Sequence, residues 1–140
     1  MEVADRLRPI LLHLARELRR ERIAGVSSPQ VTLLVSIKYA PGVTVGELAA
    51  DERVSTAAMS KRVSRLERDG LVARTQSEVD RRRIGLTLTD DGQRVLRRVR
   101  SRRTAWLASR LGTLPRDDLA AVGAAADALA RLLEGEERRA

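Results

Sequence analysis

Apolar residues recur every three or four positions along the first part of the chain, which is the spacing of one helix face. This spacing predicts a helix over residues 3–22, ended by Gly25, with an apolar stripe made of Val3, Leu7, Ile10, Leu11, Leu14 and Leu18. A second helix is expected next, because Ser28 can cap it and Pro29 suits its first position. Val31, Leu34, Val35 and Lys38 follow at helical spacing, and Pro41-Gly42 breaks the chain after them.

Two shorter helices are predicted in the middle of the chain. Thr44 and Glu47 match a capping box, in which a threonine hydroxyl and a glutamate each satisfy an unpaired backbone donor. A short helix should therefore begin at Thr44 and reach Ala50. Residues 51–54 make a tight connection, and Ser55 is expected to cap a fourth helix that ends at Gly70.

A pair of strands is predicted after these helices. The segments 71–76 and 84–88 flank a polar tip over residues 77–83. Ile84, Leu86 and Leu88 alternate with Gly85 and Thr87, which is the period of a half-buried strand. We therefore expect a hairpin.

Two longer helices complete the predicted fold. Thr89 is expected to cap the fifth, whose inward positions are Val95, Leu96, Val99, Trp106, Leu107 and Leu111. Pro115 opens the sixth, whose apolar positions are Leu119, Val122, Ala126, Leu129, Leu132 and Leu133. The tail over residues 135–140 is expected to fray.

These elements predict a mainly α fold with a small β-hairpin wing (α+β). Two short helices joined by a tight turn and followed at once by a hairpin make a winged helix-turn-helix, in which the second helix can enter the major groove of DNA. We expect one domain over residues 1–140. It consists of a winged helix-turn-helix over residues 26–89 and a helical part from both termini, residues 1–25 and 90–134.

The composition narrows the classes of function. The 140 residues include 27 basic and 19 acidic side chains, a net charge of +8, which suggests a polyanionic partner such as nucleic acid. Arginine-rich helix faces in water would give the same balance, so the positions of the charges must decide. Cysteine is absent and His13 is the one histidine, which argues against disulfides, thiol chemistry and a dedicated zinc site.

Two further classes find no support in the sequence. No nucleophile–base pair, phosphate-binding glycine loop or metal-ligand cluster indicates an enzyme, and no cofactor is expected. No apolar stretch is long enough to span a bilayer. The charged start does not resemble a signal peptide, so we expect a cytoplasmic protein with no membrane partner.

The helix after Ser55 has two different faces. Met59, Val63 and Leu66 share its apolar face, with Ala58 nearby. The other face carries small, hydroxylated and basic residues, with two arginines at its borders: Thr56, Ala57, Ser60, Lys61, Ser64, Arg62 and Arg65. Such a start lets a helix lie deep in a groove, where hydroxyls reach base edges, Ala57 touches a thymine methyl, and Lys61 and Arg65 take phosphates. An amphipathic helix with a solvated basic face is the alternative.

The hairpin tip carries three consecutive arginines, Arg81, Arg82 and Arg83. Their mutual repulsion is relieved if an anion lies against them, and a narrow minor groove offers a negative potential that accepts a guanidinium. Asp80 stands two residues before Arg82 and is expected to hold the arginine stem in place. The alternative is a solvated turn with incidental charge.

The sequence resembles the MarR family of bacterial regulators in several short motifs. They are Glu47-Leu48-Ala49, Leu66-Glu67 with Gly70-Leu71-Val72, Asp80-Arg81-Arg82, and Leu88-Thr89 with Gly92. Their order and spacing hold along nearly the whole chain. The resemblance implies a homodimer, built from the first, fifth and sixth helices of both chains, on a pseudo-palindromic DNA operator.

The resemblance also implies roles for particular residues. Residues of the fourth helix would meet the major groove: Ser55, Thr56, Ala57, Ser60, Lys61 and Arg65. Arg82 would enter the minor groove, steadied by Asp80. Arg83 stands where the family often has a small or apolar residue, so which arginine inserts is left open.

Family members commonly release DNA when a small aromatic or phenolic anion binds, and the resemblance implies such an effector here. His13, Arg16, Tyr39 and Trp106 could line its pocket, although each is also explained by a structural role. The leading hypothesis is a sequence-specific dimeric regulator, usually a repressor, released by a small molecule. The alternative is an architectural or ribosome-associated basic protein that binds nucleic acid without ligand control.

Overall fold

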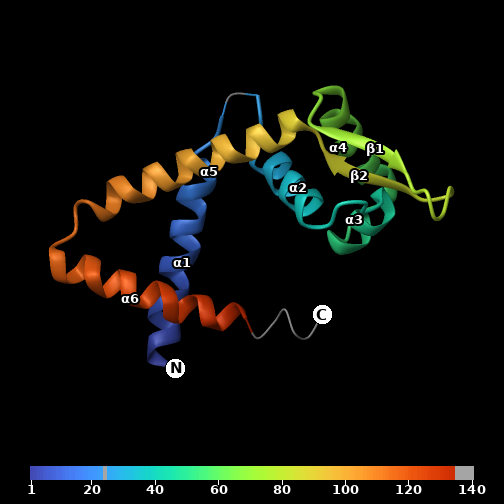
Figure 1. The fold of residues 1–140 in the computed structure, drawn as a ribbon. Helices are drawn as coiled ribbons and strands as arrows, with labels where there is room; N and C mark the ends of the chain where they lie inside the picture. Colours follow the sequence, from blue (N-terminus) through green and yellow to red (C-terminus); the bar gives the residue numbers. More distant parts are fainter. Residues whose placement is uncertain (24, 135–140) are drawn as a thin grey trace. The chain divides into compact units, whose positions relative to one another are not determined.

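The computed structural model describes residues 1–23 and 25–134 of the chain. The elements run in the order α1 (Glu2–Arg20), α2 (Ser28–Tyr39), α3 (Val45–Asp51), α4 (Thr56–Arg68), β1 (Val72–Gln76), β2 (Ile84–Leu88), α5 (Asp90–Leu111) and α6 (Arg116–Leu133) (Figure 1). This mainly helical fold with one hairpin in the described part confirms the predicted class. The predicted fraying of residues 135–140 lies outside the described residues.

The chain forms two compact units that divide between Arg103 and Thr104. The first contains the helix-turn-helix and the hairpin, and the second contains α6 and the end of α5. Among the residues that the structure describes, no helix is both long and apolar enough to cross a membrane.

The start of α2 differs by one residue from the sequence-based prediction. Ser27 is the cap: its hydroxyl accepts the Gln30 N–H at 3.3 Å, and the Gln30 side chain accepts the Ser27 N–H at 2.8 Å. Gln30 completes this reciprocal box only with Ser27, so the predicted cap at Ser28 is wrong. The Ser28 hydroxyl instead donates to the Arg19 carbonyl at 2.7 Å, at the end of α1. That helix stops at Arg20, before the predicted end at residue 22.

The caps predicted for the other helices of the first unit are confirmed. The hydroxyls of Thr44 and Ser55 accept the N–H groups of Glu47 and Ala58, each at 3.1 Å, and begin α3 and α4. Thr89 accepts the Gly92 N–H at 3.1 Å and begins α5. Helix α3 ends one residue later than predicted, at Asp51, and α4 ends at Arg68, before Gly70 takes a φ of +73°.

The hairpin is antiparallel, and Val72 pairs with Leu88 at one end and Gln76 with Ile84 at the other. Leu86 is fully buried, but the predicted alternation of β2 is wrong: Ile84 is half exposed beside the tip, Gly85 is buried as well, and Thr87 and Leu88 are both half-buried. The loop between α2 and α3 lies along the outer side of β2. The Gly42 N–H donates to the Leu86 carbonyl at 2.9 Å, and the Leu86 N–H donates to the Val43 carbonyl at 2.8 Å.

The buried core lies in the first unit and joins α2, α3, α4, the hairpin and the start of α5. Its members are Ile23, Val31, Leu33, Leu34, Ile37, Val43, Leu48, Ala49, Met59, Val63, Leu66, Leu71, Val72, Leu86, Leu96 and Val99. Helix α2 buries Leu33 and Ile37 where the sequence pattern favoured Val35 and Lys38, and Val35 is exposed. A helix that is apolar on several sides gives no single stripe to follow, which explains the error.

The apolar stripes of α1 and α6 remain uncovered in the single chain. Neither helix contains a buried residue. On α1, Val3 is 74% exposed and Ile10 is 54% exposed, and on α6 Leu132 is 69% exposed. An exposed apolar surface of this kind usually indicates a surface that contacts a partner.

Gly92 offers a test of the junction between the hairpin and α5. A Cβ atom at this position would lie 2.2 Å from the Leu71 carbonyl oxygen. We expect Gly92→Ala to lower the free energy of unfolding by about 3 kcal/mol, the upper end for overpacking, because a backbone atom cannot move aside easily. Chemical denaturation measures this change.

Gly46→Ala is the matched control for this substitution. Its added methyl would come no closer than 3.9 Å, to the Thr44 hydroxyl. Alanine is the better helix former, so the control should keep or raise stability by up to about 1 kcal/mol. Equal stabilities for the two variants would contradict the close approach at Gly92.

Candidate nucleic-acid interface

Helices α3 and α4 form the helix-turn-helix. A short turn joins them, in which the Val54 N–H donates to the Ala49 carbonyl at 3.0 Å and Arg53 takes a φ of 54°. Leu48 and Ala49 of α3 belong to the same buried cluster as the apolar face of α4. The turn and the shared core therefore hold α4 at a defined angle to α3.

Helix α4 has the two faces that the sequence predicts. Met59, Val63 and Leu66 are fully buried. The residues at the start of its other face are exposed, except that Ser60 is half-buried: Ser55, Thr56, Ala57, Ser60 and Lys61. Since the Ser55 oxygen accepts the Ala58 N–H, its hydroxyl is left to act as a donor toward a partner.

Arg62 and Arg65 lie on the flank of α4 that faces the start of α2. Both line a hollow of about 320 Å³ with Ser27, Pro29, Gln30 and Leu33. Arg65 also lines a neighbouring hollow of about 510 Å³ with Arg22, Ile23, Gly25, Val26, Ser27 and Gln30. The Gln30 side-chain nitrogen is buried and has no hydrogen-bond acceptor within the described part of the chain.

Arg74 of β1 is a residue of this region that the sequence analysis missed. Its Nε lies 2.9 Å from the Glu67 carboxylate, and its Nη2 donates to the Ser64 hydroxyl at 3.4 Å. These contacts tie α4 to the hairpin, so Ser64 and Glu67 serve the fold here. One arginine on a strand gave no signal of this role.

The hairpin tip is an ordered turn closed by its own hydrogen bonds. The Ser77 N–H donates to the Arg83 carbonyl at 2.8 Å, and the Arg83 N–H donates to the Asp80 carbonyl at 2.9 Å. The Asp80 carboxylate accepts the Arg82 N–H at 3.0 Å. Asp80 therefore steadies the backbone at Arg82, whereas the sequence analysis expected it to hold the arginine stem.

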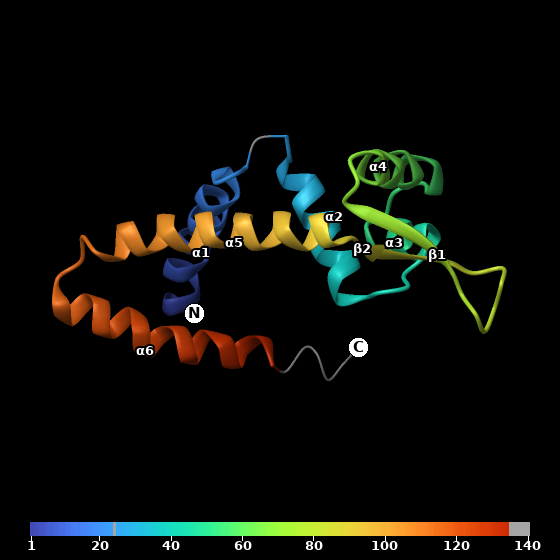
Figure 2. The same cartoon turned by 45° about the horizontal axis from the view of Figure 1, so that its top comes forward.

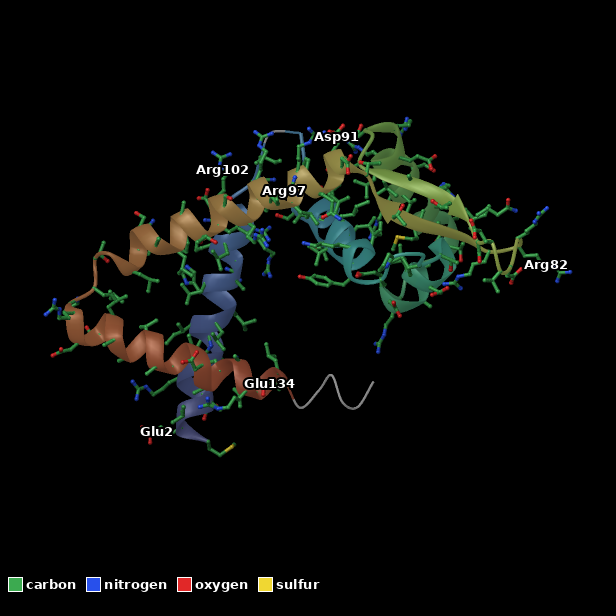
Figure 3. All side chains as sticks on the ribbon, in the orientation of Figure 1. Glu2, Arg82, Asp91, Arg97, Arg102 and Glu134 are labelled. Atoms are coloured by element: carbon green, nitrogen blue, oxygen red, sulfur yellow. The ribbon has the colours of Figure 1, made fainter. Side chains whose placement is uncertain are left out.

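The three arginines of the tip lie in different surroundings. The Arg83 guanidinium approaches the Glu47 carboxylate, with Nη1 and Oε1 2.5 Å apart, and donates from Nη2 to the Gly42 carbonyl at 3.1 Å. Within residues 1–23 and 25–134, no acidic side chain forms an ion pair with Arg81 or Arg82. Figure 3 shows Arg82 at the end of the hairpin, and Figure 2 shows from a second side that the tip extends beyond α3 and α4.

The sequence predicts Glu47 as the second half of a capping box with Thr44, but the structure contains only the threonine half, in which the Glu47 N–H donates to the Thr44 hydroxyl oxygen. Its carboxylate also accepts the Thr44 hydroxyl at 3.2 Å. The hydrogen bond from the Arg83 guanidinium holds the pKa of Glu47 below its ordinary value of 4.5, and the hydrogen bond from Thr44 adds to this effect. The carboxylate is therefore ionised at neutral pH, and its pair with Arg83 weakens only in acid.

The residues suggested for an effector pocket do not line either hollow beside Arg65. His13 lies on exposed α1 with its Nε2 3.6 Å from Glu17, and Arg16 is exposed on the same helix. Tyr39 is exposed at the end of α2, and Trp106 is half-buried on α5. A role for these four residues in an effector pocket stays a prediction.

Comparison with known proteins agrees with this geometry. The sequence model of the MarR family matches residues 26–84. The chain is 32% identical over 115 residues to the HTH-type transcriptional repressor MdtR of Bacillus subtilis, covering 82% of this chain and 74% of that protein.

Two solved structures show the same fold over almost the whole chain. Transcriptional regulator Tm0710 from Thermotoga maritima superposes with a TM-score of 0.81 at 27% identity and covers 97% of each chain. Streptococcus pneumoniae FabT, solved in complex with DNA, superposes with a TM-score of 0.61 at 25% identity and covers 96% of each chain. The chain described here belongs to the MarR family of DNA-binding transcriptional regulators.

Proposed function

We propose that this protein is a homodimeric repressor that recognises a specific pseudo-palindromic operator and is released from it by a small molecule. One observation carries the proposal: α4 offers an exposed row of small and hydroxylated side chains beside a hairpin tip whose Arg81 and Arg82 have no ion pair in the described chain. The two features fit two different grooves of one duplex.

The start of α4 is the proposed major-groove surface. Thr56, Ala57 and Ser60 are short enough to let the helix backbone come close to base edges, where hydroxyls hydrogen-bond and a methyl meets thymine. Lys61 would take a phosphate, and so would the donor hydroxyl of Ser55 at the positive end of the helix. Arg62 and Arg65, on the flank of α4, would contact phosphates beside the groove.

Arg82 is the proposed minor-groove residue. It lies at the end of the tip, and the Asp80 carboxylate fixes its backbone. A guanidinium is favoured in a narrow minor groove by the negative potential there. Arg81 would add a phosphate contact, whereas Arg83, with its guanidinium on Glu47 and Gly42, would act from within the fold.

The uncovered stripes of α1 and α6 support a homodimer. A second copy of the chain would bury them, and residues 1–25 and 90–134 would then form the dimerisation part. Two-fold symmetry would bring two α4 helices to two half-sites, which is why the operator should be pseudo-palindromic. MdtR is named a repressor, and this chain would repress transcription in the same way by occupying DNA in the cytoplasm.

An architectural or ribosome-associated protein is the competing interpretation, because it could use the same net charge without choosing a sequence. Such a protein binds mainly phosphates and favours lysine and arginine on its contact surface. At the start of α4 the corresponding residues are the exposed Thr56 and Ala57 and the half-buried Ser60, which favours contact with base edges over contact with phosphates alone. The two interpretations differ in sequence preference.

The hollows beside Arg65 are the proposed effector site. Ile23, Val26 and Leu33 provide apolar contact for an aromatic ring, and Arg22, Arg62 and Arg65 provide positive charge for an anion. The buried Gln30 amide supplies a donor that the fold leaves without an acceptor. A bound phenolic anion would withdraw Arg62 and Arg65 from the DNA backbone, and release would follow.

Replacing Arg82 tests the assignment of the tip. We expect Arg82→Ala to weaken operator binding by about ten-fold or more, since a guanidinium in a narrow groove contributes on the order of 1–3 kcal/mol. Fluorescence anisotropy with a labelled operator measures the affinity, and sedimentation should show the same dimer mass for both proteins. Unchanged affinity would refute the tip assignment, and a monomer mass would refute the dimer.

Ser60→Arg tests the proposed groove surface. Its long side chain would collide with base edges or read a different base, so the preferred sequence should change or be lost. Selection from a randomised DNA pool measures this preference and also the half-site spacing. An identical selected sequence for both proteins would contradict the surface, and no selected sequence for the unaltered protein would favour the architectural interpretation.

Salicylate, a phenolic anion, is a suitable probe for the effector site. We expect it to displace labelled operator, and Gln30→Leu should shift the required concentration upward by several-fold, because the buried amide donor is lost. Thr32→Leu, at an exposed position of α2 that lines neither hollow, is the control and should leave the displacement unchanged. Equal displacement from both variants would move the effector site away from Gln30.

A further inference from the structure

We propose that Glu47 and Arg83 are a positioning pair: together they fix the direction of the hairpin tip relative to α4 and so determine how well the protein distinguishes the DNA flanking each half-site. Neither residue needs to touch a base for this role. The inference rests on the proposed placement of Arg82 in the minor groove. It adds that this contact depends on Glu47 and Arg83, which do not take part in it.

The pair joins three parts of the first unit. The Arg83 guanidinium reaches Glu47 in the first turn of α3 at 2.5 Å and the Gly42 carbonyl in the loop between α2 and α3 at 3.1 Å. That loop is itself bonded to β2 through Gly42 and Leu86. Arg83 therefore connects the outer end of β2 to the helix-turn-helix by two separate contacts.

The tip has no other polar attachment within the described residues. The hydrogen bonds of residues 77–82 all end inside residues 76–83: Gln76 to Arg81, Asp80 to Ser77, Arg82 to Asp80, Ser77 to Arg83 and Arg83 to Asp80. The tip is thus a turn closed by its own hydrogen bonds. Its direction depends on the twist of the two strands and on the side chain of Arg83.

Thr44 holds Glu47 in place independently of Arg83. The Thr44 hydroxyl donates to the Glu47 carboxylate at 3.2 Å, and the Glu47 N–H donates to the Thr44 hydroxyl oxygen at 3.1 Å. Because α3 shares its core with α4, the carboxylate is fixed relative to the groove helix. The pair consequently sets the distance between the major-groove surface and Arg82.

The pair is exposed, and exposed ion pairs add little to stability. Its contribution to recognition is geometric, because a functional side chain must be held within about 0.5 Å of its productive position. A tip that swings more widely would still meet phosphates. It would lose the difference between a narrow A·T-rich minor groove and a wider G·C-rich one.

The experiment compares two duplexes that share the half-sites selected from the DNA pool. They differ only where the tip would lie, which is A·T-rich in one and G·C-rich in the other. The proteins are the unaltered chain, Glu47→Gln, Arg82→Ala and the double variant Glu47→Gln/Arg82→Ala. Glu52→Gln is the matched control, because it removes a nearby exposed charge that has no ion pair in the described chain.

We expect Glu47→Gln to lower the preference for the A·T-rich duplex by about three- to five-fold, the range that an exposed pair can supply. Its thermal unfolding midpoint should stay close to that of the unaltered protein. In the Arg82→Ala background the same substitution should have no further effect on the preference. Glu52→Gln should strengthen binding to both duplexes equally, as the loss of a negative charge near DNA requires.

Three results would overturn the inference. If Glu47→Gln strengthens binding to both duplexes as Glu52→Gln does, then Arg83 contacts phosphate itself and Glu47 only competes for it. If the preference falls by the same factor with and without Arg82, then the pair acts on the whole fold. If Arg82→Ala lowers the preference and Glu47→Gln does not, the tip assignment stands and the positioning role fails.

A fourth result would refute the minor-groove assignment of the proposed function together with this inference. If Arg82→Ala leaves the preference unchanged, the minor-groove assignment is refuted, and the positioning role is refuted with it.

Discussion

The contact between the backbones of Gly42 and Gly85 is the constraint on which the rest of the DNA-binding unit depends. A Cβ atom on Gly85 would lie 2.7 Å from both the Cα and the carbonyl oxygen of Gly42. Glycine at position 85 allows the loop after α2 to lie flat against β2, and Gly42 takes a φ of +87°, a backbone conformation that favours glycine. The hairpin is therefore attached to the helix-turn-helix by main chain, and Leu86 is buried between them.

Much of this fold could be predicted because its signals are local. Thr44, Ser55 and Thr89 cap helices through hydroxyls that act within three residues, so a short stretch of sequence contains the whole interaction. The limits of α1 could not be predicted in the same way. The Ser28 hydroxyl satisfies the Arg19 carbonyl only after the chain has turned back, and a contact of that range leaves no periodic pattern.

In the candidate site, too, the features that depend on nearby residues could be predicted and those that depend on distant residues could not. The buried and exposed faces of α4 follow from helical spacing alone, and the structure bears out that division. Arg81, Arg82 and Arg83 look alike in the sequence, and the fold distinguishes them, because Glu47 and Gly42 approach Arg83 only when α3 packs beside the hairpin. Nothing local identifies that partnership. Arg83, which the sequence suggests as a DNA contact, in this way forms contacts within the fold.

The exposed apolar stripes of α1 and α6 have a consequence for how DNA occupancy depends on protein concentration. In the proposed homodimer two copies must meet before either stripe is covered, so the paired form would rise with the square of the protein concentration in dilute solution. Occupancy of the proposed two-half-site operator would then respond more steeply to synthesis and degradation than it would for a single-chain binder. A modest change in abundance would thus act as a threshold, with no ligand required to sharpen it.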